Sequence, residues 1–413
     1  MSGSASSDSG ASATSNKRSC IQIGTSARFQ SPTRSPNTIL LFGSGTRIPE
    51  IDFFRGVALL VIFWDHLHWL VGMGVPLHYG FSDGAAVFVF LSGYVSGLVY
   101  SKVYDKMGLR GLILKAGRRA CQLYSAHLLV LLSLFDLSAI IPTSRMPEQM
   151  LLFLARLSHG RFTTVRQILG LQYFPFLCDI LPLYVLFILS IPFFLPLIKR
   201  NWKAGLGLAF ALYVSAQFLP ALNIEARYAS WSLNPFCWLF LFVTAMTLSI
   251  KTREGTLKIP VRSALVAGAL GVMIYAFFDL KPVNGLLLKS GISRAYVMPL
   301  FPSPFPLAQK NLQQPVALLH FFCFAYVVFF LKPYFHRLYE SPLARPFKAC
   351  GQNSLPVYTA GIVLNYVAAC LIAPQQWNHT SFYLFSLTGW GVIIALGMFL
   401  SRLHTVRPGL QTG

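Results

Sequence analysis

The sequence predicts an all-α protein that crosses a membrane many times, and three observations support this prediction. Hydrophobic residues make up 54% of the 413 residues and charged residues only 11%, against roughly 25% charged residues in an average soluble domain. The mean hydropathy is +0.57. Apolar runs of roughly 20 residues, the length that spans the hydrocarbon core of a bilayer, recur along most of the chain.

The first 46 residues stand apart from these apolar runs. They are rich in Ser, Gly, Thr and Arg and lack the hydrophobic stretch that a secretory signal needs. Such a composition does not support a packed core, so we expect a disordered, basic cytoplasmic tail. A Ser- and Arg-rich start also resembles an organelle transit peptide. Residues 47–405 then form the membrane domain, and 406–413 a short cytoplasmic tail.

Ten apolar runs are long enough to cross the bilayer. The expected spans are 51–71, 84–101, 119–141, 180–198, 204–221, 235–250, 260–280, 313–331, 354–373 and 382–401. Cytoplasmic segments of membrane proteins retain positive charge. With the N-terminus inside, the cytoplasmic segments hold 24 of the 34 Lys and Arg residues, and the external loops hold 9. This asymmetry predicts about ten spans with both termini cytoplasmic. Because the sixth run is short, nine or eleven spans are the alternatives.

The basic charge is mainly a topology signal. The net charge of +21 would suggest nucleic acid only if the basic residues clustered on one soluble face, and they do not, so we expect no nucleic-acid partner. Two external segments, 142–179 and 281–312, are long and show no obvious structure. Loops of that length are usually functional or disordered.

The cysteine pattern predicts neither a disulfide framework nor a metal site. No Cys-x-x-Cys occurs, and no cysteine stands at metal-ligand spacing from a histidine. Most of the cysteines lie in apolar runs, so we interpret them as core thiols. They are Cys20, Cys121, Cys178, Cys237, Cys323, Cys350 and Cys370.

The first apolar run carries the residues most suggestive of chemistry, Arg55 and His66. Eleven residues of helix turn through about 1,100°, so both side chains point to one side, roughly 16 Å apart. Arg55 suits a phosphate or carboxylate, or else is a snorkelling anchor. His66 suits a general base, or else is a hydrogen-bonded core histidine. Asp52 lies three residues before Arg55, close enough to pair with it, whereas Asp65 is adjacent to His66 and is expected to point elsewhere.

The start of the second run adds a carboxylate and small residues. Asp83 is expected near the outer end of the first run, where it orients a histidine, binds a sugar hydroxyl, or is simply an exposed turn carboxylate. Ser92 and Tyr94 lie within the run. Gly93 and Gly97 have the spacing that lets two helices pack closely, which favours a structural role for them.

Polar residues become sparser further along the chain. Tyr124 and His127 share one face of the third run at i, i+3. Lys310 precedes the eighth run, and His320 lies within it, where a lone histidine is more often a satisfied core residue than a site residue. Asn353 opens the ninth run, where a helix cap explains it adequately.

Seven blocks of this sequence resemble a known family. They read RIPEIDFFRGVALLVIFWDH, GFSDGAAVFVFLSGY, RRACQLYSAHLL, DILPLYVLFILSIPFFL, WSLNPFCWLFLFV, LLHFFCFAY and GQNSLPVYTAG. In this order, from Arg47 to Leu403, they resemble successive blocks of the OpgC protein family, whose members succinylate osmoregulated periplasmic glucans. Each block alone is weakly specific, but seven in one order indicate membership.

The resemblance implies a function. The family is similar to the wider membrane acyltransferase-3 group, in which an Arg and a His with this spacing on the first helix mark the active centre. It implies a multi-pass O-acyltransferase of the bacterial inner membrane, with Arg55 holding acyl-CoA, expected to be succinyl-CoA. His66 then serves transfer to a hydroxyl of a periplasmic glucan or related glycan. The residues expected to bind donor or substrate are Asp52, Asp83, Ser92, Tyr94, Tyr124, His127, Lys310, His320 and Asn353. We expect no permanently bound cofactor and no metal; the bilayer, acyl-CoA and the glycan are the expected partners.

Three residues depart from the family pattern: Ala86 replaces an acid, Cys121 a Trp and Ala317 an Arg. They bear on the substrate more than on the fold. Two other functions stay open. One is a transporter with an intramembrane His, Arg and Asp relay, although no repeat of two related halves is apparent. The other is a non-catalytic partner of glycan synthesis. No covalent nucleophile is evident beside His66, which favours direct transfer.

Overall fold

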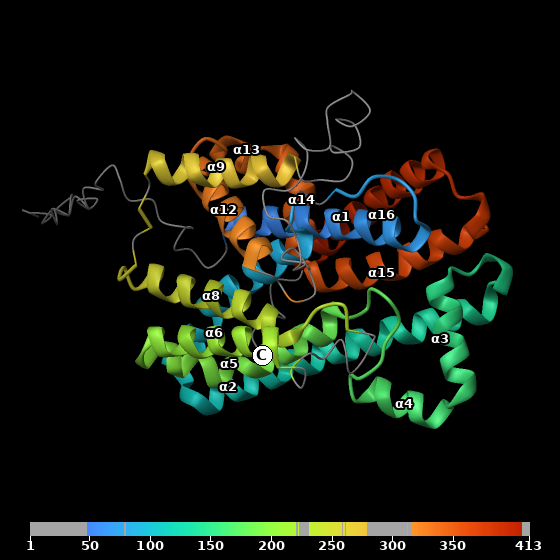
Figure 1. Cartoon of the computed structure of the whole chain (residues 1–413), viewed down its shortest axis with the longest axis horizontal. Coiled ribbons are helices and arrows are strands. Elements are labelled where there is room, and N and C mark those ends of the chain that lie inside the picture. The colour runs from blue at the N-terminus through green and yellow to red at the C-terminus, as the bar shows by residue number, and fades with distance from the viewer. Residues whose placement is uncertain are drawn as a thin grey trace, which may run out of the picture. The chain divides into compact units, whose positions relative to one another are not determined.

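The computed structural model describes residues 48–77, 80–219, 222, 231–257, 259–260, 262–278, 312 and 315–406. Within these ranges the chain is helical and contains no β-strand. The helices are α1 (Pro49–Val71), α2 (Gly84–Ile140), α3 (Glu148–His159), α4 (Arg161–Leu169), α5 (Ile180–Arg200), α6 (Trp202–Phe218), α8 (Pro235–Arg253), α9 (Ser263–Phe278), α12 (Pro315–Leu331), α13 (His336–Glu340), α14 (Arg345–Gln352), α15 (Ser354–Leu371) and α16 (His379–Val406) (Figure 1). Short 3-10 helices cover Thr143–Arg145, Pro342–Ala344 and Pro374–Gln376. The predicted tail 1–46, Lys310 and residues 407–413 lie outside the described residues.

Six of the described helices are long and apolar enough to cross a membrane, namely α1, α2, α5, α8, α15 and α16. Helices α9 and α12 are apolar but shorter. Every predicted apolar run overlaps one of the described helices, which confirms the all-α class. The count of ten spans and the cytoplasmic position of both termini stay predictions.

Helix α2 joins two of the predicted runs, 84–101 and 119–141. Its 57 residues correspond to about 86 Å of straight helix, far more than one bilayer needs. A kink interrupts it at Gly108, where φ is +63°, a conformation that glycine adopts without steric cost. The basic segment between the two runs is therefore helical, because Lys, Arg and Leu are good helix formers.

Two glycines let α1 cross α14 at very short range. A Cβ atom at Gly56 would lie 1.9 Å from the carbonyl oxygen of Phe347, and one at Gly351 would lie 1.8 Å from that of Asp52. Side chains at either position would separate the two helices. Helix α1 also packs against α2, α15 and α16, and it lies alongside α15 and α16 in Figure 1. This packing fixes the helix that carries Arg55 and His66.

Helix α2 packs against α5 and α8. A Cβ at Gly93 would lie 2.3 Å from the carbonyl oxygen of Phe242, and one at Gly97 would lie 2.6 Å from that of Met246. Both glycines therefore face the backbone of α8. The predicted structural role of the Gly93 and Gly97 pair is confirmed.

Of the two alternatives for the segment 142–179, functional or disordered, the disordered one is wrong, because the segment contains α3 and α4. The Arg156 guanidinium lies 4.4 Å from the ring centroid of Tyr173, and the Tyr124 hydroxyl donates a hydrogen bond to the carbonyl of Leu169 over 2.9 Å. These contacts hold the two helices without a long apolar run, which is why hydropathy alone misses them. The segment predicted at 281–312 lies outside the described residues except for Leu312.

Candidate active site

Arg55 lies in the second turn of α1 and is held by two neighbouring helices. Its Nη2 donates a hydrogen bond to the Oγ of Ser354, the first residue of α15, over 2.7 Å. Its guanidinium carbon lies 5.3 Å from the ring centroid of Phe88 on α2, within the range of a cation–π contact. The Nε atom is buried and has no hydrogen-bond partner among the described residues. The contacts with Ser354 and Phe88 position the side chain, and its buried Nε donor is not used by either contact.

A cavity of about 590 Å³ opens beside Arg55. Three further basic residues line it, Lys115, Arg118 and Arg119, all from the second half of α2. Helices α2, α5 and α15 also contribute hydroxyl groups, from Ser92, Tyr184, Ser354 and Tyr358. We call this space the basic cavity. Four guanidinium or ammonium groups around one cavity create a binding site for a polyanionic ligand.

His66 lies towards the far end of α1 and lines a different cavity, of about 400 Å³. The side chains of Asp65, Asp83 and Asp179 line the same space, together with Ser82 and Ser232. We call it the acidic cavity. His66 is partly exposed, so a ligand in this cavity has access to its ring. Carboxylates and hydroxyls together suit a ligand rich in hydroxyl donors, such as a sugar.

Backbone amides hold the three carboxylates of the acidic cavity. The Leu77 amide donates to Asp65 Oδ1 over 2.7 Å, and the Ser232 amide donates to Asp179 Oδ2 over 3.1 Å. Asp83 caps α2 by accepting a hydrogen bond from the Ala86 amide over 3.1 Å. The three carboxylates are therefore held in fixed orientations at the wall of the acidic cavity.

The two cavities meet at a thin partition. Ile180 lines both of them. Tyr358 lines the basic cavity, and its ring lies 6.4 Å from that of His66 in an edge-to-face arrangement. Both residues also line a small void of about 10 Å³ between α1 and α15, at the lower limit for a single water molecule. Ile180, Tyr358 and His66 therefore lie where the two cavities approach each other.

The cysteine next to the acidic cavity is a poor nucleophile. Cys178 precedes Asp179 and is 1% exposed. Burial, and then the neighbouring Asp179 carboxylate, raise the pKa of the Cys178 thiol, so it stays protonated and unreactive. Within the described part of the chain, no group of three or more His, Cys, Asp or Glu side chains is placed to hold a metal ion.

Three other predicted site residues support the site from outside the two cavities. The Asp52 carboxylate accepts a hydrogen bond from Gln352 over 3.2 Å, which ties α1 to α14. His320 is buried and its Nδ1 lies 2.7 Å from the Oγ of Ser82, a residue of the acidic cavity. The Asn353 amide donates to the carbonyls of Ala349 and Gly397 and to Ser401 Oγ. Asn353 occupies the N-cap position of α15, as the cap interpretation expects, but its side chain makes no capping bond to α15 and joins α14 to α16 instead.

Tyr94, Tyr124 and His127 line neither cavity. Tyr94 is buried in the core, and Tyr124 binds the backbone at the end of α4. His127 is fully buried against the ring of Phe174, with a centroid distance of 5.8 Å. The structure therefore brings together Arg55 with Ser92, and His66 with Asp83, but leaves these three apart.

Sequence comparison places the chain in one family. A family model described as OpgC protein matches residues 47–405. The chain belongs to the OpgC protein family. No curated protein and no solved structure matches it. Membership of the OpgC family confirms the resemblance of the seven blocks and implies an enzyme of the acyltransferase type. The wider relation to the acyltransferase-3 group stays a prediction.

The two cavities of this OpgC family member also contain residues that were not predicted as site residues. Asp65 and Asp179 share the acidic cavity with His66, and Tyr184 and Tyr358 share the basic cavity with Arg55. The peptide LPLY at 181–184 and the peptide LPVY at 355–358 both place a tyrosine three residues after a leucine and two after a proline. Such a polar residue inside an apolar run is the signal that would have identified both tyrosines.

The three departures from the family pattern lie outside both cavities. Ala86 and Ala317 are buried in α2 and α12, with exposed fractions of 0% and 1%. Cys121 is exposed on α2. Ala86 therefore lies outside the lining of the acidic cavity, which contains the carboxylates of Asp65, Asp83 and Asp179.

Proposed function

We propose that this OpgC family member is an O-acyltransferase of the bacterial inner membrane. It transfers an acyl group, expected to be succinyl, from acyl-CoA to a hydroxyl of a periplasmic glucan or related glycan. One observation supports this proposal above all: a single helix, α1, presents Arg55 to a basic cavity and His66 to an acidic one. The distribution of Lys and Arg assigns the Arg55 end to the cytoplasm and the His66 end to the periplasm.

The basic cavity would bind the donor. Coenzyme A carries several phosphate charges, and Lys115, Arg118 and Arg119 provide matching cations beside Arg55. A helix of eleven residues separates Arg55 from His66 by roughly 16 Å. A succinyl carboxylate lies only a few bonds from the thioester, so it cannot reach Arg55 while the thioester carbonyl is at His66. We therefore assign Arg55 to a phosphate of the donor during transfer.

The acidic cavity would bind the acceptor and host the reaction. Sugar hydroxyls donate hydrogen bonds to carboxylates, which suits Asp65, Asp83 and Asp179. His66 takes the proton of one hydroxyl as that oxygen attacks the thioester carbonyl. The carbon–sulfur bond breaks, the new ester forms, and the departing thiolate receives the proton from His66. The products are the acylated glycan and free coenzyme A.

Direct transfer fits this arrangement better than a covalent enzyme intermediate. The cysteine next to the acidic cavity, Cys178, is buried and stays protonated. Direct transfer requires donor and acceptor to meet, so the thioester end of the donor would pass between Ile180 and Tyr358 to reach His66.

Mass spectrometry of periplasmic and surface glycans tests the proposal. Four strains are compared: a deletion strain, and the same strain complemented with the natural protein, with His66→Ala or with His68→Ala. His68 is a matched control because it lies on the same helix, with Nδ1 2.7 Å from the Met73 carbonyl oxygen, and lines neither cavity. We expect a glycan mass increment of one acyl group with the natural protein and with His68→Ala, and none with His66→Ala.

The increment also identifies the acyl group, because succinyl and smaller acyl groups differ in mass. Glycans that are identical in all four strains, with each protein detected in the membrane, would contradict the proposed acceptor. An increment that persists in His66→Ala would contradict the role of His66 as general base.

A further inference from the structure

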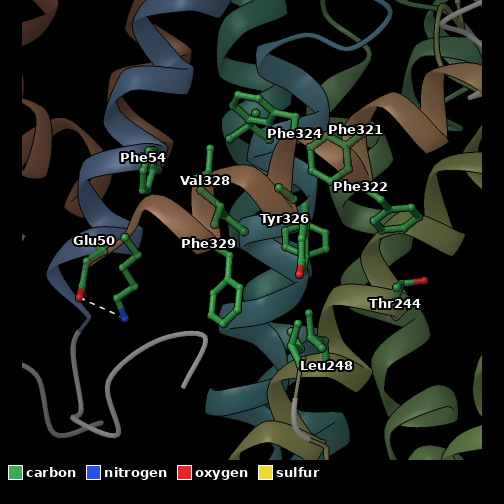
Figure 2. A pocket seen from close by; sticks show the side chains of 16 residues that line it. Glu50, Phe54, Thr244, Leu248, Phe321, Phe322, Phe324, Tyr326, Val328 and Phe329 are labelled. Atoms are coloured by element: carbon green, nitrogen blue, oxygen red, sulfur yellow. Dashed lines mark ion pairs between the residues drawn. The ribbon is translucent and has the colours of Figure 1, made fainter. Parts of the chain in front are cut away.

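A third space in the protein has no link to the two cavities of the candidate active site. It is a groove of about 240 Å³ between α12 and the helices α1, α2 and α8. Its walls are almost entirely apolar, and Figure 2 shows ring and aliphatic side chains turned towards one another across it. They include Phe54 of α1, Phe90 of α2, Leu248 of α8, and Phe322 and Phe329 of α12.

Helix α12 contacts its neighbours at both ends of this groove. At one end the ring of Phe321 lies 5.3 Å from that of Phe90. At the other end the ammonium group of Lys332 lies 3.4 Å from the carboxylate of Glu50, the ion pair marked by the dashed line in Figure 2. These two contacts fix α12 against α2 and α1 at the ends of the groove, and the groove lies between them.

The polar groups in the groove wall are already satisfied. The Tyr326 hydroxyl donates to the carbonyl of Pro260 over 2.8 Å, and the Thr244 hydroxyl donates to the carbonyl of Phe240 over 2.7 Å. Water in the groove would find few hydrogen-bond partners, and apolar spaces of this kind stay dry. An empty groove would forfeit dispersion contacts along its walls. In a bilayer, a hydrocarbon chain is the available filling.

The charged end of the groove points to the headgroup. Glu50 opens the first turn of α1, and Lys332 follows the last residue of α12. Their side chains are 14% and 18% exposed, so part of each reaches the surface at this end of the groove. A lipid whose chain lies in the groove would place its headgroup at this pair, where a carboxylate and an ammonium group stand side by side.

We propose that this groove binds one acyl chain of phosphatidylethanolamine, with the headgroup on the Glu50 and Lys332 pair. The lipid phosphate would face Lys332, and the lipid ammonium would face Glu50. An anionic lipid such as phosphatidylglycerol also offers a phosphate to Lys332, but it brings no cation to Glu50. The charge arrangement therefore favours the zwitterionic lipid. This inference does not depend on the proposed acyl transfer.

Native mass spectrometry of the full chain tests the proposal. The protein is released from nanodiscs that contain equal amounts of phosphatidylethanolamine and phosphatidylglycerol. We expect one retained lipid per chain, with phosphatidylethanolamine about fivefold more frequent than phosphatidylglycerol. This ratio corresponds to roughly 1 kcal/mol, the size of one favourable charge contact near a membrane surface.

Variants that fill the groove provide the second arm. Ala325→Trp places a large side chain in the groove, and Val87→Phe does so from the opposite wall. We expect both to abolish retention. Ala395→Trp on the exposed face of α16 is the matched control and should retain the lipid. Thermal melting shows which variants are folded. If Ala325→Trp is unfolded, Val87→Phe tests the proposal in its place.

Variants of the charged pair provide the third arm. Glu50→Gln should bring the two lipids to equal frequency, because the contact with the ammonium group is lost. Lys332→Gln should lower retention of both lipids. Equal retention of the two lipids by the natural protein would overturn the headgroup assignment. Retention that survives in folded Ala325→Trp or Val87→Phe would overturn the groove as the site.

Discussion

Arg55 and Ser354 are 299 positions apart in the sequence, yet the guanidinium Nη2 donates a hydrogen bond to the serine Oγ over 2.7 Å. This contact joins α1, the helix that also carries His66, to the first residue of α15. One turn further along α15 lies Tyr358, which lines the basic cavity and lies beside the ring of His66. The bond therefore links Arg55, in the proposed donor site, to the helix that carries Tyr358.

Ser354→Ala should weaken donor binding without unfolding the protein. Hydrogen bonds to charged groups contribute about 1.5–3 kcal/mol, so loss of this one should raise the KM for acyl-CoA about tenfold. The control is Ser190→Ala, because the Ser190 hydroxyl binds only the carbonyl of Phe187 in its own helix. Steady-state transfer by purified protein gives both constants. An unchanged KM in Ser354→Ala would show that the bond does not position Arg55.

Tyr358→Ala should open the partition between the two cavities. Water would then reach the bound thioester, which a closed site excludes. We expect more release of coenzyme A in the absence of any acceptor, together with less acylated glycan per donor consumed. Tyr358→Phe retains the ring and should behave like the natural protein. Equal acceptor-free release from all three proteins would argue against Tyr358 as the partition.

Asp83 has two roles that one pair of substitutions separates. It caps α2 through the Ala86 amide, and its carboxylate lines the acidic cavity. Asn is as good a cap as Asp, whereas Ala costs about 1 kcal/mol. Asp83→Asn should therefore keep the thermal stability but raise the KM for the glycan. Asp83→Ala should lower the thermal stability and also raise the KM for the glycan. A normal KM in Asp83→Asn would limit Asp83 to its capping role.

The sequence predicts those parts of the site that lie on one helix. Helical geometry alone puts Arg55 and His66 on the same helix about three turns apart, and each lines a cavity of its own. Adjacency predicts that Asp65 points away from His66. The structure differs because the cavity extends around α1, and the Leu77 amide holds the Asp65 carboxylate within it.

The rest of the site comes from distant parts of the chain. Asp179 reaches the acidic cavity from the start of α5, and Tyr358 reaches the partition from α15. No local period or motif links either residue to His66, because tertiary packing brings them together. Tyr124 and His127 show the converse. They share a helix face, as predicted, but the end of α4 contacts Tyr124 and Phe174 contacts His127.

Gly93→Ala should damage the fold rather than the chemistry. A Cβ atom there would lie 2.3 Å from the Phe242 carbonyl oxygen, so α2 and α8 would have to separate. Overpacking of this kind costs about 1–3 kcal/mol. Gly271→Ala is the control, since no atom lies within 4 Å of a Cβ at that position of α9, and it should be neutral or slightly stabilising. Thermal unfolding in detergent compares the two, and equal midpoints would contradict the close packing.

The expected family pattern has an acid at position 86 and an Arg at position 317, which predicts an ion pair between these positions that Ala86 and Ala317 cannot form. Both residues are buried, and Phe90 and Phe321, which are in ring contact, each lie four residues further along their helix. Residues four apart share a helix face. Ser82, just before α2, contacts His320 near the start of α12, and α12 ends at Lys332 beside Glu50, so the two helices run in the same direction. Ala86 and Ala317 therefore each lie one turn before a residue of the Phe90 and Phe321 ring contact, on the same face of its helix.

Ala86→Glu and Ala317→Arg should each destabilise the protein alone and compensate each other together. A single buried charge without its partner costs about 3–5 kcal/mol, whereas a pair in contact neutralises much of that penalty. We expect the double variant to melt above both single variants, which a double-mutant cycle measures as a favourable coupling energy. Additive losses would show that the two positions do not meet, and that the departures arose independently. A favourable coupling would instead show that the two positions meet, as the expected family pattern predicts.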